Sequence, residues 1–153
     1  MKNRAINSPG NAVGKQRQEL YRHAVVQINE ALKNGFFLEA IAIEESLIAD
    51  RLESRLSQLL GRDYSHRTLK NLSDVVEREE TDQALRDIVL NDLNPWRLSR
   101  NSAIHEMVKL AEGDTRTWRD RMDGLGPIAK KGIELFRAVD KHVTRLRNST
   151  RST

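Results

Sequence analysis

The sequence predicts an all-α protein in which five to six helices pack as a bundle. Three observations favour this fold class. Apolar side chains recur at three- and four-residue intervals over long segments, as Leu20, Ala24 and Ile28 do. No segment alternates apolar and polar residues as a half-buried strand does, and no hairpin turn is flanked by β-branched runs. Glycine and proline are few, and most stand where helices are expected to end.

Turn and capping residues divide this pattern into separate helices. A glycine is expected to close each of the first two helices in the left-handed conformation. The fourth helix is capped by Thr81 or Asp82 and the fifth by Ser99 or Asn101, since short polar side chains accept hydrogen bonds from free backbone N–H groups. Pro95 is expected to separate the fourth helix from the fifth. In chain order, the expected helices span residues 15–33, 36–60, 68–79, 82–93 and 99–111, then a short piece at 118–122 and a final helix at 127–147.

We expect one domain, because 153 residues are enough to bury a single core. Residues 1–14 are expected to form a flexible arm, 15–147 the helical domain, and 148–153 a polar tail. The first residues lack the apolar stretch of a signal peptide, and no apolar run approaches the roughly 20 residues of a membrane span. A cytoplasmic protein with no membrane partner is therefore expected.

The net charge of +4 conceals an uneven distribution. Residues 36–94 carry 13 acidic and 7 basic side chains, whereas residues 95–153 carry 7 acidic and 13 basic ones. This pattern fits an anionic partner that meets one face, and it equally fits segments that neutralise each other on folding. With no cysteine, disulfides, zinc–thiolate sites and thiol catalysis are excluded. Gly-rich phosphate loops and the common hydrolase and zinc motifs are absent, so no metal and no cofactor are expected.

One segment contains the groups needed to cleave RNA without a metal. Arg100, Asn101 and His105 fall near the expected start of a helix, where backbone N–H groups also favour a bound phosphate. An imidazole can take the proton of a ribose 2′-hydroxyl or protonate the leaving 5′-oxygen, while a guanidinium stabilises the phosphate charge. Asn101 shares a helix face with His105 and can orient either group. One histidine per chain is a poor acid–base pair, and a two-fold homodimer supplies two.

The Arg-Asn-x-x-x-His signature at 100–105, late in an all-α chain and followed by a long helix, resembles the HEPN superfamily (higher eukaryote and prokaryote nucleotide-binding). The likeness of architecture covers about 15–147, and the specific motif only 100–105. The resemblance implies a dimeric helical bundle and a metal-independent endoribonuclease of toxin–antitoxin, phage-defence or RNA-processing systems. It implies that Arg100 and His105 are catalytic, that Asn101 supports them, that RNA is the substrate and that an antitoxin is a possible partner.

The resemblance also implies a polar residue on the second helix near the catalytic pair. Glu44, Glu45 and Asp50 are the candidates, and the sequence does not choose among them. A subset of the superfamily carries a tyrosine two residues after the histidine, which partner nucleotidyltransferases modify. This chain departs from that pattern, because the position holds Met107.

Basic side chains near the motif are candidate phosphate contacts, although a solvated basic face explains them equally well. They are Arg97, Arg116, Arg119, Lys130 and Lys131. Trp96 and Trp118 flank the motif and are expected to pack in the core rather than to stack on bases.

Two other functions remain open from the sequence. In the first, the protein is a non-catalytic helical dimerisation or regulatory module, and Arg100 and His105 hold helix ends together. In the second, residues 114–137 form a DNA-binding helix-turn-helix around the turn Gly124-Leu-Gly-Pro127.

Overall fold

The computed structural model describes residues 4–6, 10 and 12–152, and all the regular structure within them is helical, which confirms the predicted all-α class. Because α4 (Gln83–Ile88), the π-helical segment η1 (Val89–Leu93) and α5 (Asn94–His105) follow one another without a break, the described chain forms six helical rods. Along the chain the elements are α1 (Val13–Asn34), α2 (Phe37–Leu60), α3 (Leu69–Glu79), α4 (Gln83–Ile88), η1 (Val89–Leu93), α5 (Asn94–His105), α6 (Trp118–Gly124) and α7 (Gly126–Arg151). None of the described helices combines the length and the apolar character needed to cross a membrane.

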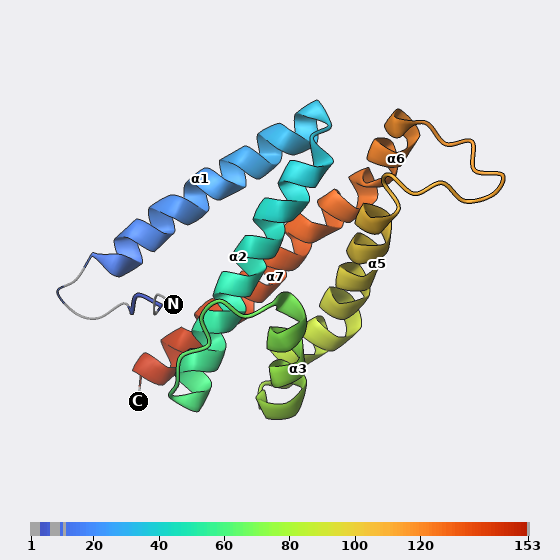
Figure 1. Ribbon diagram of the computed structural model, residues 1–153. Helices are drawn as coiled ribbons and strands as arrows, with labels where there is room; N and C mark the ends of the chain where they lie inside the picture. The colour runs from blue at the N-terminus through green and yellow to red at the C-terminus, as the bar shows by residue number, and fades with distance from the viewer. Residues whose placement is uncertain (1–3, 7–9, 11, 153) are drawn as a thin grey trace.

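The long helix α2 is the centre of the bundle. Figure 1 shows α1 and α2 joined as a hairpin, α7 running along α2, and α5 on the side away from α1. The hairpin turn at Gly35 and the end of α2 at Gly61 both have a left-handed backbone, with φ of 76° and 65°, as the sequence predicts. The apolar stripe of α2 is fully buried and packs against α1 and α7 through residues such as Ile41, Ile48, Leu52, Leu56, Ile28 and Val139.

The predicted break at Pro95 is wrong. Proline has no backbone N–H, and its ring would collide with the carbonyl group of Asn91, four residues earlier. The preceding turn, Val89–Leu93, is wound as a π-helix, and the N–H of Asn94 bonds the carbonyl of Val89 five residues back. This wider turn accommodates Pro95 in the first turn of α5, so the chain continues as a helix.

The predicted helix over 99–111 is also wrong at both ends. The helix begins at Asn94 and ends at His105, and residues 106–117 form a loop that projects from the bundle in Figure 1. Arg121 on α6 holds this loop, because its guanidinium donates hydrogen bonds to the carbonyl groups of Glu106 and Lys109, the second at 2.9 Å. It also pairs with the Asp114 carboxylate at 3.0 Å. In a longer helix, backbone N–H groups would donate to these carbonyl groups, whereas here Arg121 does so.

Described parts of the predicted arm and tail contact the bundle or are helical. The described Arg4 pairs with Asp50 and, at 3.1 Å, with Glu53, and α1 begins already at Val13. Helix α7 continues to Arg151, and the hydroxyl groups of Ser149 and Thr150 donate to the Leu146 carbonyl at 2.9 Å each. The rest of the predicted arm and tail, residues 1–3, 7–9, 11 and 153, lies outside the described residues.

A buried ion pair ties α2 to the turn between α3 and α4. The guanidinium of Arg55 forms a fork to the Glu80 carboxylate at 2.8 and 2.7 Å, and the backbone N–H of Asp82 adds a third bond at 2.9 Å. Burial alone would raise the pKa of Glu80, but these donors lower it below its usual value. Asp82 then caps α4 by accepting a bond from the Leu85 N–H, as predicted.

Three helices meet most closely at Gly132 of α7. A methyl group placed there would lie 2.9 Å from Cζ2 of Trp96 on α5 and 2.7 Å from Cδ of Glu44 on α2. The indole N–H of Trp96 donates to the carbonyl of Ile128 at 2.8 Å, which fixes α5 against the first turn of α7. Trp96 is therefore a core residue, as predicted, whereas Trp118 is 58% exposed.

We predict that Gly132→Ala destabilises the protein by about 1–3 kcal/mol, because α2, α5 or α7 must shift to admit the methyl group. Gly124→Ala is the matched control, since a methyl group at that helical position meets nothing within 4 Å. It should be neutral or stabilise by up to about 1 kcal/mol. Urea unfolding of both variants measures the difference, and equal effects would contradict the close packing at Gly132.

Candidate functional site

The motif residues Arg100, Asn101 and His105 all lie on α5, but not at its N-terminal end. Arg100 and Asn101 are in the middle of the helix, half-buried, and His105 is its exposed last residue. The expected phosphate-binding helix start is therefore wrong, because α5 begins six residues before Arg100. Arg100 and His105 are five residues apart, about 140° around the helix axis, so their side chains leave α5 in different directions.

Arg100 is held by Glu45 of α2. One guanidinium nitrogen lies 2.5 Å from the carboxylate, and the side chains of Arg100 and Glu45 are only 17% and 32% exposed. The Nε atom of Arg100 is buried with no hydrogen-bond partner among the described residues. The structure thus fixes the position of a half-buried guanidinium and leaves part of its donor capacity unused.

Glu44, the neighbour of Glu45, is fully buried at the α2–α5–α7 contact. Neither of its carboxyl oxygens has a well-formed hydrogen bond in the described structure. Burial raises the pKa of Glu44 to about 8, and the nearby backbone N–H of Ile133 offsets this only in part. Glu44 is therefore mainly protonated at neutral pH and belongs to the core, one residue away from the carboxylate that meets Arg100.

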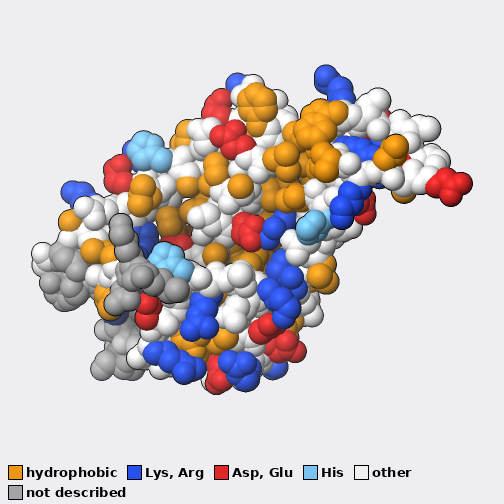
Figure 2. Space-filling view, viewed as in Figure 1, with side chains coloured by type: hydrophobic (Ala, Val, Ile, Leu, Met, Phe, Trp, Pro, Cys, Tyr) orange, Lys and Arg blue, Asp and Glu red, His pale blue; other side chains and the backbone are white. Residues whose placement is uncertain are grey.

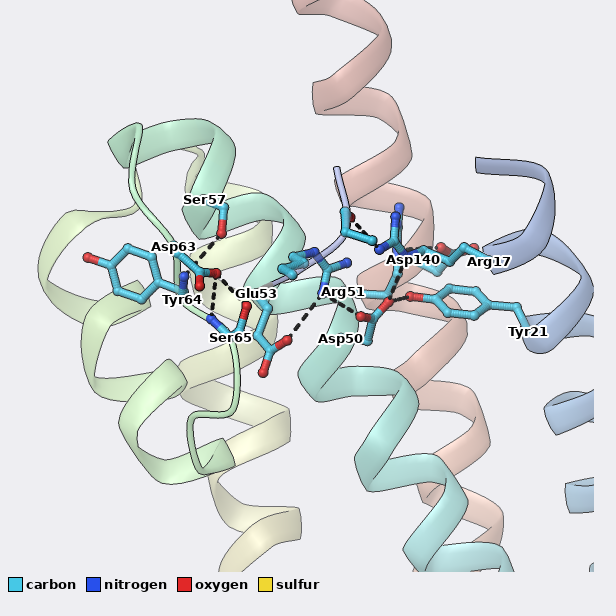
Figure 3. Close-up of polar contacts among 12 residues, drawn as sticks. Arg17, Tyr21, Asp50, Arg51, Glu53, Ser57, Asp63, Tyr64, Ser65 and Asp140 are labelled. Carbon is cyan, nitrogen blue, oxygen red and sulfur yellow. Dashed lines mark hydrogen bonds and ion pairs between the residues drawn. The ribbon is translucent and has the colours of Figure 1, made fainter. Parts of the chain in front are cut away.

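Asp50, the third candidate, belongs to a different part of the molecule. It accepts hydrogen bonds from Tyr21 of α1 and from Arg4, and Figure 3 shows Tyr21 reaching across to it. Burial alone would raise the pKa of Asp50, but the hydrogen bonds from Arg4 and Tyr21 lower it. Of the three carboxylates, the structure brings only Glu45 to the motif.

The candidate phosphate contacts come from α5, the projecting loop, α6 and α7. Arg97 is half-buried on α5, and its Nε atom has no hydrogen-bond partner among the described residues. Arg116 pairs with Asp114 at 2.7 Å in the projecting loop and, with Arg121, holds the pKa of that carboxyl below its usual range. Arg119 is exposed on α6. Lys130 and Lys131 are exposed on α7.

Exposed apolar side chains lie close to the motif in the chain. Five large ones on α5, the projecting loop and the start of α6 are at least 36% exposed: Leu98, Ile104, Val108, Leu110 and Trp118. Figure 2 shows apolar side chains gathered around the region of α6, next to basic side chains over α5. The sequence reasoning missed this surface, because Ile104, Val108 and Ala111 fit the buried stripe of the helix expected over 99–111. Helix α5 has instead already ended at His105, so Val108 lies in the loop and is exposed.

Among the described residues, no group of three or more histidine or carboxylate side chains is placed to hold a metal ion. Comparisons with family models, with curated protein sequences and with solved structures find no match to this chain. The geometry defines an all-α protein with a carboxylate-held arginine and an exposed histidine on one helix.

We predict that the protein loses stability as pH rises, because Glu44 must stay protonated in the folded state. The unfolded carboxyl ionises near its ordinary value of 4.5 and the folded one near 8, so stability is fully present below pH 4.5 and falls until about pH 8. Glu44→Gln should reduce this loss by about 1–3 kcal/mol.

Urea unfolding at pH 5 and pH 9 measures this effect. Glu30→Gln, a substitution at an exposed position on α1, is the control and should leave the pH dependence as in the wild type. An unchanged pH dependence in Glu44→Gln would show that Glu44 is not the group responsible.

Proposed function

We propose that the protein is a metal-independent endoribonuclease of the HEPN type, whose site forms between two copies of the chain. The observation that carries this proposal is the pairing of Glu45 with Arg100 at 2.5 Å. The resemblance implies a polar residue of the second helix near the catalytic pair, and Glu45 of α2 meets Arg100.

The exposed apolar side chains support a homodimer that joins the α5 surfaces. Val108 and Leu110 are 85% and 79% exposed directly after His105, and exposed apolar area of this kind favours association. In a two-fold pair, the same surface meets itself, so the partner's His105 enters near the first copy's site. This arrangement supplies the second imidazole that one chain lacks.

The proposed reaction needs only these side chains. His105 takes the proton of a ribose 2′-hydroxyl, and the 2′-oxygen attacks the adjacent phosphorus atom. The bond from phosphorus to the 5′-oxygen breaks, and the partner's His105 gives that oxygen a proton. Arg100, oriented by Glu45, stabilises the charge that grows on the phosphate. The products are a 2′,3′-cyclic phosphate and a 5′-hydroxyl end. A role as a toxin or phage-defence component, neutralised by an antitoxin, belongs to the same proposal.

A non-catalytic module is the second candidate, and the same ion pair favours it. Glu45 and Arg100 join α2 to α5, so Arg100 has a structural partner without any substrate. The helix-turn-helix alternative has less support. Only Leu125, which is fully buried, separates α6 from α7, whereas that motif uses a turn of three or four residues.

We predict that His105→Ala and Arg100→Ala each lower RNA cleavage in EDTA by about 100-fold or more, as expected for loss of an acid–base group or a phosphate clamp. His23→Ala, which removes an exposed imidazole on α1, is the control and should cleave like the wild type.

Circular dichroism and analytical ultracentrifugation should show all three variants folded and with the wild-type oligomeric state. A wild type that cleaves no RNA, or only with a divalent metal, contradicts the ribonuclease. If Arg100→Ala lowers stability and cleavage persists, the Glu45–Arg100 ion pair is structural and not catalytic.

A further inference from the structure

A second polar site lies on the other side of α2, where α1, α2 and α7 form an open cleft of about 840 Å³. Ser54, which lines it, follows Glu45 by nine residues and is therefore on the opposite face of α2. Six basic side chains line the cleft: Arg4, Lys15, Arg17, Arg51, Arg147 and Arg151.

Three of these cations have carboxylate partners. Asp50 pairs with Arg4 and, at 3.5 Å, with Arg17, and Asp140 of α7 lies 2.8 Å from the Nε atom of Arg51. Figure 3 shows Arg51 and Asp140 side by side, next to the Tyr21–Asp50 pair. Arg51 also donates to the Thr144 hydroxyl at 3.2 Å. This network holds the walls of the cleft in a fixed geometry.

Arg147 forms no ion pair with a carboxylate among the described residues, although the charge of Asp140 acts on it. Its Nε atom is buried without a hydrogen-bond acceptor in the described part of the chain. Burial lowers the pKa of Arg147, and the positive charges of Arg51 and Arg151 lower it further. Arg151 follows Arg147 by one helical turn on the same face of α7. The described structure thus holds the half-buried guanidinium of Arg147 near two other cations, with its Nε donor unused.

We propose that this cleft binds phosphate groups, carried either by a free nucleotide or by a nucleic acid strand. A phosphate has the charge and the several acceptor oxygens that suit the unpartnered Nε of Arg147 and the side chains of Arg151 and Lys15, which line the same cleft. The volume is in the range of small-ligand sites and admits more than one phosphate group. The cleft is separate from Arg100 and His105, so the proposal does not rest on the ribonuclease.

Isothermal titration calorimetry on the full chain tests this inference with three probes: pyrophosphate, adenosine triphosphate and a short DNA oligonucleotide, which has no 2′-hydroxyl to react. We expect saturable binding of at least one probe and a loss of affinity of about tenfold in Arg147→Met, which keeps an unbranched apolar stem but removes the charge. Arg137→Met is the matched control, because Arg137 is exposed on α7 outside the cleft.

The three probes distinguish the source of the phosphate. Tighter binding of adenosine triphosphate indicates a nucleotide, and tighter, strongly salt-dependent binding of the oligonucleotide indicates a strand. Removing a repelled charge should leave Arg147→Met folded and at least as stable as Arg137→Met without ligand. If it fails to fold, Arg151→Met on the exposed rim takes its place. Absence of binding by every probe, or equal affinities in the cleft variant and the control, overturns the proposal.

Discussion

The close approach of α2, α5 and α7 at Gly132 determines where the candidate site lies. The buried carboxyl of Glu44 and the indole of Trp96 both lie where a side chain on residue 132 would stand. The hydrogen bond from Trp96 to the Ile128 carbonyl then fixes α5 along its axis. Four residues after Trp96, one turn of α5 brings Arg100 to Glu45, the neighbour of Glu44. The geometry of the arginine site therefore depends on packing in the core rather than on surface charge.

Charges between distant parts of the chain are complementary, which explains the uneven distribution along the sequence. The acidic middle third supplies Glu45 and Asp82, and the basic final third supplies their partners Arg100 and Arg145. Around Arg147, in the cleft, the described structure leaves this neutralisation incomplete. Internal neutralisation, one of the two alternatives that the sequence leaves open, is therefore seen between these segments, and the anionic partner is what we propose for the cleft.

The sequence predicts the helices well where a single residue type decides the local backbone. Gly35, Gly61 and Asp82 end or cap helices as expected, because left-handed and capping conformations are local properties. The prediction of helix boundaries fails where contacts with residues distant in the sequence determine the backbone. The π-helical turn before Pro95 lets the helix continue, and Arg121 draws the chain after His105 into a loop.

The same distinction between local and long-range determinants applies to the two proposed sites, the motif on α5 and the basic cleft. Arg100 and His105 are proposed from the motif and its context in the sequence. Glu44 and Glu45 differ by only 100° on α2, and only the core packing decides which of them meets Arg100. The cleft escapes sequence reasoning altogether, since its basic residues come from the N-terminal segment and three helices.

We propose that α5 carries a site that uses the ribose 2′-hydroxyl as its nucleophile. This is tested by cleavage, in EDTA, of an RNA that has a single 2′-deoxynucleotide immediately 5′ of the scissile phosphate, with the same substitution one nucleotide away as a control. We expect only the first substrate to resist cleavage, and cleaved RNA to end in a 2′,3′-cyclic phosphate. Cleavage of the first substrate at the normal rate would contradict it.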